Sequence, residues 1–159
     1  MDDNKMIWLA IAIGTALSQH PKPHQPNHHP KALQATPVRH SNAEIHCVAR
    51  AIYFEARGEP QSCREKVAHV IVNRMRHRMF PNSACNVVYQ RNQFEWVKYN
   101  PQVRDHVAYQ QAIKDATAVL QGKRDTTNGA QFFSTGYRFR NTRQVDRCGG
   151  HVFFRTTLT

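Results

Sequence analysis

Glu55 has the sequence surroundings of a carboxyl group that can act as a general acid. It lies in the run YFEARGEP (53–60), directly after two aromatic residues and near the end of an apolar helical pattern. Aromatic neighbours exclude water from a carboxyl group, and the negative end of a helix dipole opposes its ionisation. Both effects raise its pKa toward the range in which it can protonate a substrate near neutral pH. The structural alternative is an ion pair with Arg57.

A second carboxyl group, Glu59, follows four residues later in the same run. Two carboxyl groups are what hydrolysis of a glycosidic bond ordinarily requires, one as the acid and one as base or nucleophile. Glu59 lies beyond Gly58 and beside Pro60, where it can also cap a helix or pair with Arg64. Both roles stay open for Glu59 at the level of the sequence.

The elements around these residues are predicted to be mostly helical. The apolar spacing after Ser41 or Asn42 predicts a helix that ends before Gly58, and the capping-box pattern from Ser62 to Glu65 predicts a second helix. The second helix is expected to continue to about residue 78. The segments that follow are a short helix over 81–89, an aromatic loop over 92–101, a helix from Asp105 to Gly122, and strands over 130–134 and 151–156. The predicted fold class is α+β, with a small antiparallel sheet late in the chain.

Composition and charge limit the class of partner. The 159 residues suffice for one domain, and a hydrophobic content of 40% excludes a wholly disordered chain. Lys and Arg number 22 against 11 acidic residues, so the net charge is +11. A polyanionic partner follows, which is a nucleic acid, an anionic membrane or a wall polymer. With no glycine-rich phosphate loop and no zinc-type spacing of Cys and His, we expect neither cofactor nor metal.

Three segments divide the chain. Residues 1–17 contain a short apolar run, 6–17, which is too short for an ordinary membrane span and fits an export signal or transient membrane anchor. A short helix packed on the domain is the alternative. Residues 18–43 are rich in Pro and His and predict a stiff linker. Residues 44–159 form the predicted catalytic domain. Its four cysteines, Cys47, Cys63, Cys85 and Cys148, allow up to two disulfides of undetermined connectivity.

Four motifs in order resemble the cell-wall hydrolase family typified by the spore-cortex-lytic enzymes. They are AIYFEARGEP, KVAHVIVNRM, FPNSACNVVYQ with QFEW, and GGHVFF, and they span about 110 residues from Glu44 to Arg155. The resemblance implies a lysozyme-like domain that cuts peptidoglycan between N-acetylmuramic acid and N-acetylglucosamine, with Glu55 as the catalytic residue. One acid without a paired nucleophile implies a lytic transglycosylase that forms 1,6-anhydromuramic acid ends. A muramidase that hydrolyses the same bond is the alternative.

The resemblance also indicates substrate-binding positions. Gln93 and Phe94 match the family's QF motif, and sugar-binding clefts use an amide for polar groups and an aromatic face for the ring. Core packing is the alternative for Phe94. Tyr53 is a candidate for the same wall, Glu59 matches the family motif, and His151 in GGHVFF matches a family position, with a structural histidine as its alternative. Asn73 and Arg74 are expected to tie helices together by hydrogen bonds.

Partners and location follow from the same resemblance. We expect a monomer that acts on peptidoglycan, does not bind nucleic acid, and works in the periplasm, in the cell wall or after secretion, in phage host lysis or bacterial wall remodelling. The rival hypothesis is a non-catalytic basic module that binds nucleic acid or anionic wall polymer. Its patch would use arginines at 74, 76, 78, 138, 140 and 143, aided by Tyr137 and Phe139.

Overall fold

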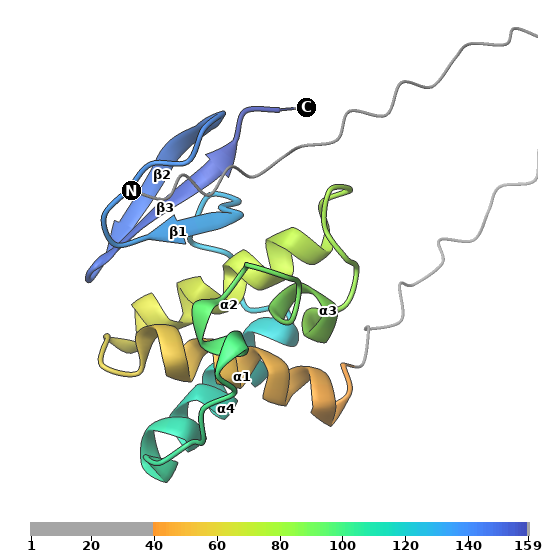
Figure 1. Cartoon of the computed structure of the whole chain (residues 1–159), viewed down its shortest axis with the longest axis vertical. Coiled ribbons are helices and arrows are strands. Elements are labelled where there is room, and N and C mark those ends of the chain that lie inside the picture. The colour runs from red at the N-terminus through yellow and green to blue at the C-terminus, as the bar shows by residue number, and fades with distance from the viewer. Residues whose placement is uncertain (1–39, 159) are drawn as a thin grey trace, which may run out of the picture. The chain divides into compact units, whose positions relative to one another are not determined.

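The structure, a computed structural model, describes residues 40–158. The predicted export segment, 1–17, and the linker up to residue 39 lie outside the described residues. In chain order the elements are α1 (Asn42–Ala56), α2 (Gln61–Met75), α3 (Ala84–Val88), the 3-10 helix η1 (Glu95–Lys98), α4 (His106–Leu120), β1 (Phe132–Ser134), β2 (Thr142–Cys148) and β3 (His151–Thr156). Figure 1 shows the helices gathered below a separate small sheet. The expected α+β class is confirmed.

Helix α1 begins and ends where the sequence predicts. Ser41 accepts a hydrogen bond from the Glu44 backbone N–H at 3.2 Å, and the Glu44 carboxylate accepts from the Ser41 N–H at 3.3 Å, which forms a capping box. The same carboxylate accepts from the Ala84 N–H at the start of α3. One acidic side chain therefore closes the first turn of α1 and holds α3 against it.

The predicted capping box of α2 is wrong. The helix begins at Gln61 with Pro60 as its N-cap, and no side chain caps it. Ser62 lies inside the first turn, and the Glu65 carboxylate accepts from Gln61 and from Lys123 instead. The pattern fails because the helix starts one residue before Ser62, and Pro60 at the N-cap has no side-chain oxygen that could accept from the first backbone N–H groups. The helix also ends at Met75, three residues before the predicted end, in a tightened turn.

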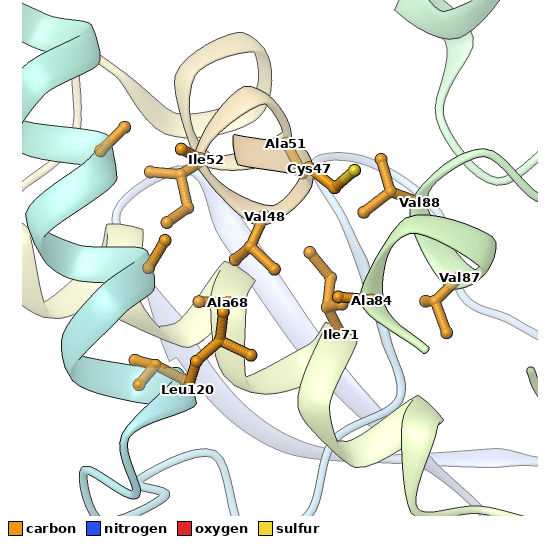
Figure 2. Packing of buried hydrophobic residues seen from close by; sticks show 14 of the residues in the cluster. Cys47, Val48, Ala51, Ile52, Ala68, Ile71, Ala84, Val87, Val88 and Leu120 are labelled. Atoms are coloured by element: carbon orange, nitrogen blue, oxygen red, sulfur yellow. The ribbon is translucent and has the colours of Figure 1, made fainter. Parts of the chain in front are cut away.

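The core lies between the four α-helices. Figure 2 shows Val48 and Ile52 of α1 facing Ala68 and Ile71 of α2, with Leu120 of α4 beside them. Ala84, Val87 and Val88 of α3 close the other side, and all three are fully buried. Alanines at the contact points let the helix axes approach closely. This packing fixes the end of α1, where Glu55 is placed, relative to α2.

The sheet has three antiparallel strands in the order β1-β3-β2. Strands β1 and β3 were predicted, but β2 was not, because its sequence TRQVDRC has one aliphatic residue and no alternation of apolar and polar residues. It is an edge strand with an irregularity in its pairing between Gln144 and Asp146, and edge strands need little apolar character. Phe153 of β3 packs against Val70 of α2 and thereby joins the sheet to the helices.

Hydrogen bonds from the end of α2 fix the segment that leads into β1. The Asn73 side chain donates to Asp125, to Thr127 and to the Ala130 carbonyl at 2.9, 3.3 and 3.0 Å. The buried Arg74 donates through Nε to the Gln131 carbonyl at 2.7 Å. The two residues have the structural role that the sequence predicts, although they bind α2 to the sheet segment rather than to another helix.

All four cysteines are paired. Cys47 of α1 bonds to Cys85 of α3, and Cys63 of α2 bonds to Cys148 at the end of β2. The first bridge lies within the helical part. The second is a covalent bond between the helices and the sheet, and it lies one residue before the turn Gly149–Gly150 that leads into β3.

Candidate active site

Glu55 lies in the last turn of α1, and its side chain is half-buried. Burial raises the pKa of its carboxyl above the ordinary value, and the nearby negative charge of Glu95 raises it further. The indole of Trp96 partly opposes this increase. The net effect keeps more of the acid protonated near neutral pH, which is the state that a general acid requires.

Trp96 forms the wall beside Glu55. Its ring lies 4.8 Å from Phe54 and 6.0 Å from Phe94, and the Arg50 guanidinium lies 5.4 Å from it. Its buried Nε1 atom has no partner that meets hydrogen-bond geometry within the described residues, although the indole N–H acts on the Glu55 carboxyl. The N–H therefore faces the acid at longer range and remains able to donate a hydrogen bond.

Glu59 holds the turn between β2 and β3. Its carboxylate accepts a hydrogen bond from the Gly150 N–H at 3.0 Å. A Cβ atom at Gly149 would lie 1.8 Å from a Glu59 carboxylate oxygen, and the φ of Gly149 is +56°. Arg64 contacts Glu59 through the backbone carbonyl, at 3.0 Å, while its guanidinium pairs with Asp115 at 2.7 Å. The ion pair with Arg64, one of the alternatives for the Glu59 carboxylate, is therefore not formed.

His151 follows that turn and points into the protein. It is 5% exposed, and its ring meets Phe133 edge to face at 5.2 Å. Burial lowers the pKa of the imidazole, and the charge of Glu59 only partly opposes this shift. The ring is neutral near pH 7, and its buried Nδ1 has no hydrogen-bond partner among residues 40–158.

Phe94 connects these two groups. It is 4% exposed and packs 6.0 Å from Trp96 and 6.2 Å from Phe133, so it is part of the core. Gln93, just before it, is half-buried. Ring contacts thus run without interruption from Trp96 through Phe94 and Phe133 to His151. These contacts and the hydrogen bond between Glu59 and Gly150 link Glu55, Glu59, Phe94 and His151 in the region where the helices meet the sheet, and Gln93 directly precedes Phe94.

Tyr53 is not brought to this region. It is 3% exposed, and its hydroxyl accepts hydrogen bonds from the backbone N–H groups of Arg104 and Asp105 at 3.2 and 3.0 Å. Residues two apart on a helix point about 200° apart, so Tyr53 and Glu55 occupy opposite sides of α1. Tyr53 holds the start of α4 in place.

Sequence reasoning did not identify Glu95, Phe133 or the turn Gly149–Gly150 as parts of the site. Glu95 is inside the QFEW motif, which could have indicated it as a third carboxyl group. No sequence signal marks Phe133, because it is one apolar residue in a short strand. The turn belongs to the site because its Gly150 N–H binds Glu59, a contact between residues 91 positions apart in the chain.

A family model described as Cell Wall Hydrolase matches residues 58–154. The chain belongs to the cell wall hydrolase family. The matched range includes Glu59, Gln93, Phe94 and His151, whereas Glu55 lies three residues before it. The family match therefore does not reach Glu55, whose role as the acid stays a prediction.

The chain is also similar to spore cortex-lytic enzymes. It is 30% identical to that of Bacillus subtilis over 118 residues, which covers 71% of this chain and 38% of the relative. It is 28% identical to that of Oceanobacillus iheyensis over 129 residues, which covers 74% of this chain and 43% of the relative. The chain spans about two fifths of the length of these curated relatives.

Two solved structures resemble the fold. The catalytic domain of the germination-specific lytic transglycosylase SleB from Bacillus anthracis matches with a TM-score of 0.61 and 27% identity, over 76% of this chain and 100% of that one. The catalytic domain of the Bacillus cereus SleB protein also matches with a TM-score of 0.61, over 77% of this chain and 97% of that one, at 24% identity. The second likeness concerns the fold alone.

Proposed function

We propose that the protein cleaves the glycan strand of peptidoglycan between N-acetylmuramic acid and N-acetylglucosamine, with Glu55 as the general acid. The observation that carries this proposal is the raised pKa of the half-buried Glu55 carboxyl beside Trp96 and Glu95. Membership of the cell wall hydrolase family and the similarity to a lytic transglycosylase of Bacillus anthracis support the choice of substrate. Gln93 is proposed to contact the sugar, and the buried rings of Trp96 and His151 are proposed to form the wall behind it.

We infer a lytic transglycosylase mechanism. Glu55 donates its proton to the oxygen that bridges the two sugars, the bond from that oxygen to C1 of the muramic acid breaks, and positive charge develops at C1. The resulting carboxylate then takes the proton of the sugar's 6-hydroxyl, whose oxygen bonds to C1 and closes the anhydro ring. Glu59 is committed to the Gly150 N–H, which supports a mechanism without a second catalytic carboxylate.

The alternative is a muramidase, and the position of Glu95 favours it. Glu95 is exposed, and its charge acts on Glu55, so it is the carboxyl group best placed to activate water. Under this alternative, water attacks C1 and leaves a reducing end. Glu95→Gln would then abolish cleavage, whereas under the transglycosylase mechanism it only changes the pH dependence.

Product analysis separates the two mechanisms. Purified peptidoglycan is digested with the wild type, Glu55→Gln and Glu95→Gln, and the fragments are analysed by mass spectrometry before and after borohydride reduction. We expect anhydro ends, which are lighter by one water than reducing muramic acid ends and do not react with borohydride. We also expect a rate at least ~100-fold lower for Glu55→Gln in a folded protein. Reducible ends alone would replace the transglycosylase by a muramidase, and an active Glu55→Gln protein would remove Glu55 from the mechanism.

The proposed place of action is outside the cytoplasm, in the periplasm, the cell wall or the medium. Two disulfides support an oxidising compartment, and the net charge of +11 supports retention on an anionic wall. Between residues 40 and 158, no helix has the length and apolar character needed to cross a membrane. We propose a monomer that takes part in phage host lysis or bacterial wall remodelling and is carried to the envelope by residues 1–17.

A further inference from the structure

Arg50, near the middle of α1, is a half-buried cation without an acidic partner. Its guanidinium donates through Nη2 to the Asn100 side-chain oxygen at 3.1 Å and to the Pro101 carbonyl at 3.2 Å. Its Nε atom is buried and has no hydrogen-bond partner within residues 40–158, and no carboxylate of this range pairs with the guanidinium. Burial of a charge costs free energy unless other contacts compensate for it. The contacts of Arg50 therefore have to offset this cost.

Two aromatic rings provide part of this compensation. The central carbon of the Arg50 guanidinium lies 5.2 Å from the ring centre of Phe54 and 5.4 Å from that of Trp96. Both distances are within the range of ~6 Å in which a ring face attracts a cation. The two rings themselves lie 4.8 Å apart. Arg50 thus joins Phe54 of its own helix and Trp96 of η1 in one cluster.

The hydrogen bonds of Arg50 fix the segment at the end of η1. Asn100 and Pro101 follow directly after this 3-10 helix and its C-cap, and the Asn100 N–H donates to the Trp96 carbonyl at 3.1 Å. The φ of Asn100 is +41°, in the left-handed region that asparagine adopts more readily than most residues. Because η1 is a short 3-10 helix without a side-chain cap, it has little stability of its own. The position of η1 relative to α1 therefore depends on contacts such as those of Arg50.

Two residues that act on the Glu55 carboxyl belong to η1. Burial and the charge of Glu95 raise the pKa of Glu55, and the Trp96 indole lowers it. Arg50 and Glu55 both lie on α1, and side chains five positions apart leave a helix about 140° apart. The guanidinium thus does not face the carboxyl group, and its influence on Glu55 is carried by the position of η1.

We propose that Arg50 is a positioning residue for the acid, because its guanidinium holds η1 against α1 and thereby keeps Trp96 and Glu95 beside Glu55. This inference rests on the proposed function, in which Glu55 is the general acid. Without the guanidinium, the segment after η1 loses two hydrogen bonds and Trp96 loses its contact with the cation. Water then reaches Glu55 more easily, so the burial that is the largest cause of its raised pKa decreases.

The first test measures the position of Trp96 without any cleavage. The chain has two tryptophans, so Trp8→Phe leaves Trp96 as the only indole. In this background, acrylamide quenching of the Trp96 fluorescence is compared between the parent protein, Arg50→Met and the control Arg104→Met. Arg104 is exposed and its side chain has no ion pair among the described residues, and both variants lose one positive charge. We expect quenching to be at least ~2-fold stronger in Arg50→Met and unchanged in the control. Equal quenching in the three proteins would overturn the proposal.

The second test is the pH–rate profile on purified peptidoglycan. The folded Arg50→Met protein should be at least ~10-fold slower than the wild type, since small displacements at a catalytic site are costly. The alkaline fall of its profile should move to lower pH, because the raised pKa of Glu55 decreases with its burial. Arg50→Lys keeps the charge and can reach one acceptor, so it should recover part of the rate and part of the shift. Arg104→Met should keep the wild-type profile.

Asn100→Gly is an independent variant that decides the question if Arg50→Met does not fold. Glycine suits the left-handed backbone at this position, while the side-chain acceptor of Arg50 is lost. We expect its profile to move in the same direction as that of Arg50→Met, by a smaller amount. An unshifted profile in the folded variants would contradict the positioning role. An active Glu55→Gln protein would overturn the proposed function and its link to Arg50, whereas the quenching result would still show whether Arg50 positions Trp96.

Discussion

Removing the disulfide between Cys63 and Cys148 is the perturbation that best separates the site from the rest of the fold. The bridge joins α2 to the end of β2, and the next three residues are Gly149, Gly150 and His151. Without it, this turn is held to the segment between α1 and α2 mainly by the hydrogen bond from Gly150 to Glu59. The double variant Cys63→Ala/Cys148→Ala therefore loosens the side of the site that carries His151.

The second disulfide provides a matched control. Cys47→Ala/Cys85→Ala removes the bridge between α1 and α3, which is not bonded to the Gly149–Gly150 turn. The sequence separations are 85 and 38 residues, for which loop-closure entropy gives stabilities of about 4.6 and about 3.9 kcal/mol. The two variants should therefore lose similar amounts of stability. Cys63→Ala/Cys148→Ala, called the site-side variant below, should be slightly the less stable.

Activity should separate the two variants where stability does not. Both proteins are kept at a temperature where circular dichroism shows them folded, and the release of soluble fragments from purified peptidoglycan is followed. We expect the site-side variant to be at least tenfold slower than the wild type, because a displacement of about 1 Å at a catalytic site can cost two orders of magnitude. The control should stay within threefold. Equal activity of the two folded variants would refute the conclusion that the bridge positions the site.

Three further predictions concern the carboxyl groups. The pKa of Glu55 is higher in the folded than in the unfolded chain, so the folded state binds its proton more tightly and loses stability as pH rises from about 4.5 through the folded pKa. Glu55→Gln should remove this loss of stability. The variant should melt at a higher temperature than the wild type at pH 8, with a smaller difference at pH 4. An unchanged or lower melting temperature at pH 8 would contradict the raised pKa of Glu55. Trp96→Phe removes the N–H that lowers the Glu55 pKa, so it should move the alkaline fall of the pH–rate profile to higher pH. Glu95→Gln removes a negative charge that raises this pKa, so it should move the fall to lower pH. Shifts in the same direction would exclude the described positions of Trp96 and Glu95 around Glu55. Gly149→Ala should cost about 1 to 2 kcal/mol for its left-handed backbone, plus the hydrogen bond of the displaced Glu59 side chain, in denaturant titrations. Adding Glu59→Ala to Gly149→Ala should cost little more, and full additivity of the two losses would show that the side chains do not meet.

The sequence alone determined the features that depend on neighbours along the chain. The capping box of α1 needs only Ser41 and Glu44, and the helical spacing of apolar residues placed α1, α3 and α4. Four motifs in order identified the family, which the match over residues 58–154 confirms. Helix periodicity alone could also have separated Tyr53 from Glu55, since positions two apart face opposite sides. The edge strand β2 was missed because few of its side chains are buried and its pattern lacks an apolar face.

Only the tertiary structure decided which distant residues meet. Four cysteines allow three connectivities, and the pairs observed are those whose Cα atoms the packing brings to 5.2 and 5.3 Å. The surroundings of Glu55 depend on Glu95 and Trp96, about forty residues later, and Glu59 reaches a turn that lies ninety residues away in the chain. Such contacts form because apolar side chains from the whole chain are buried together in one arrangement. The free energy that favours this arrangement comes from packing between distant segments, so no short stretch of sequence predicts it.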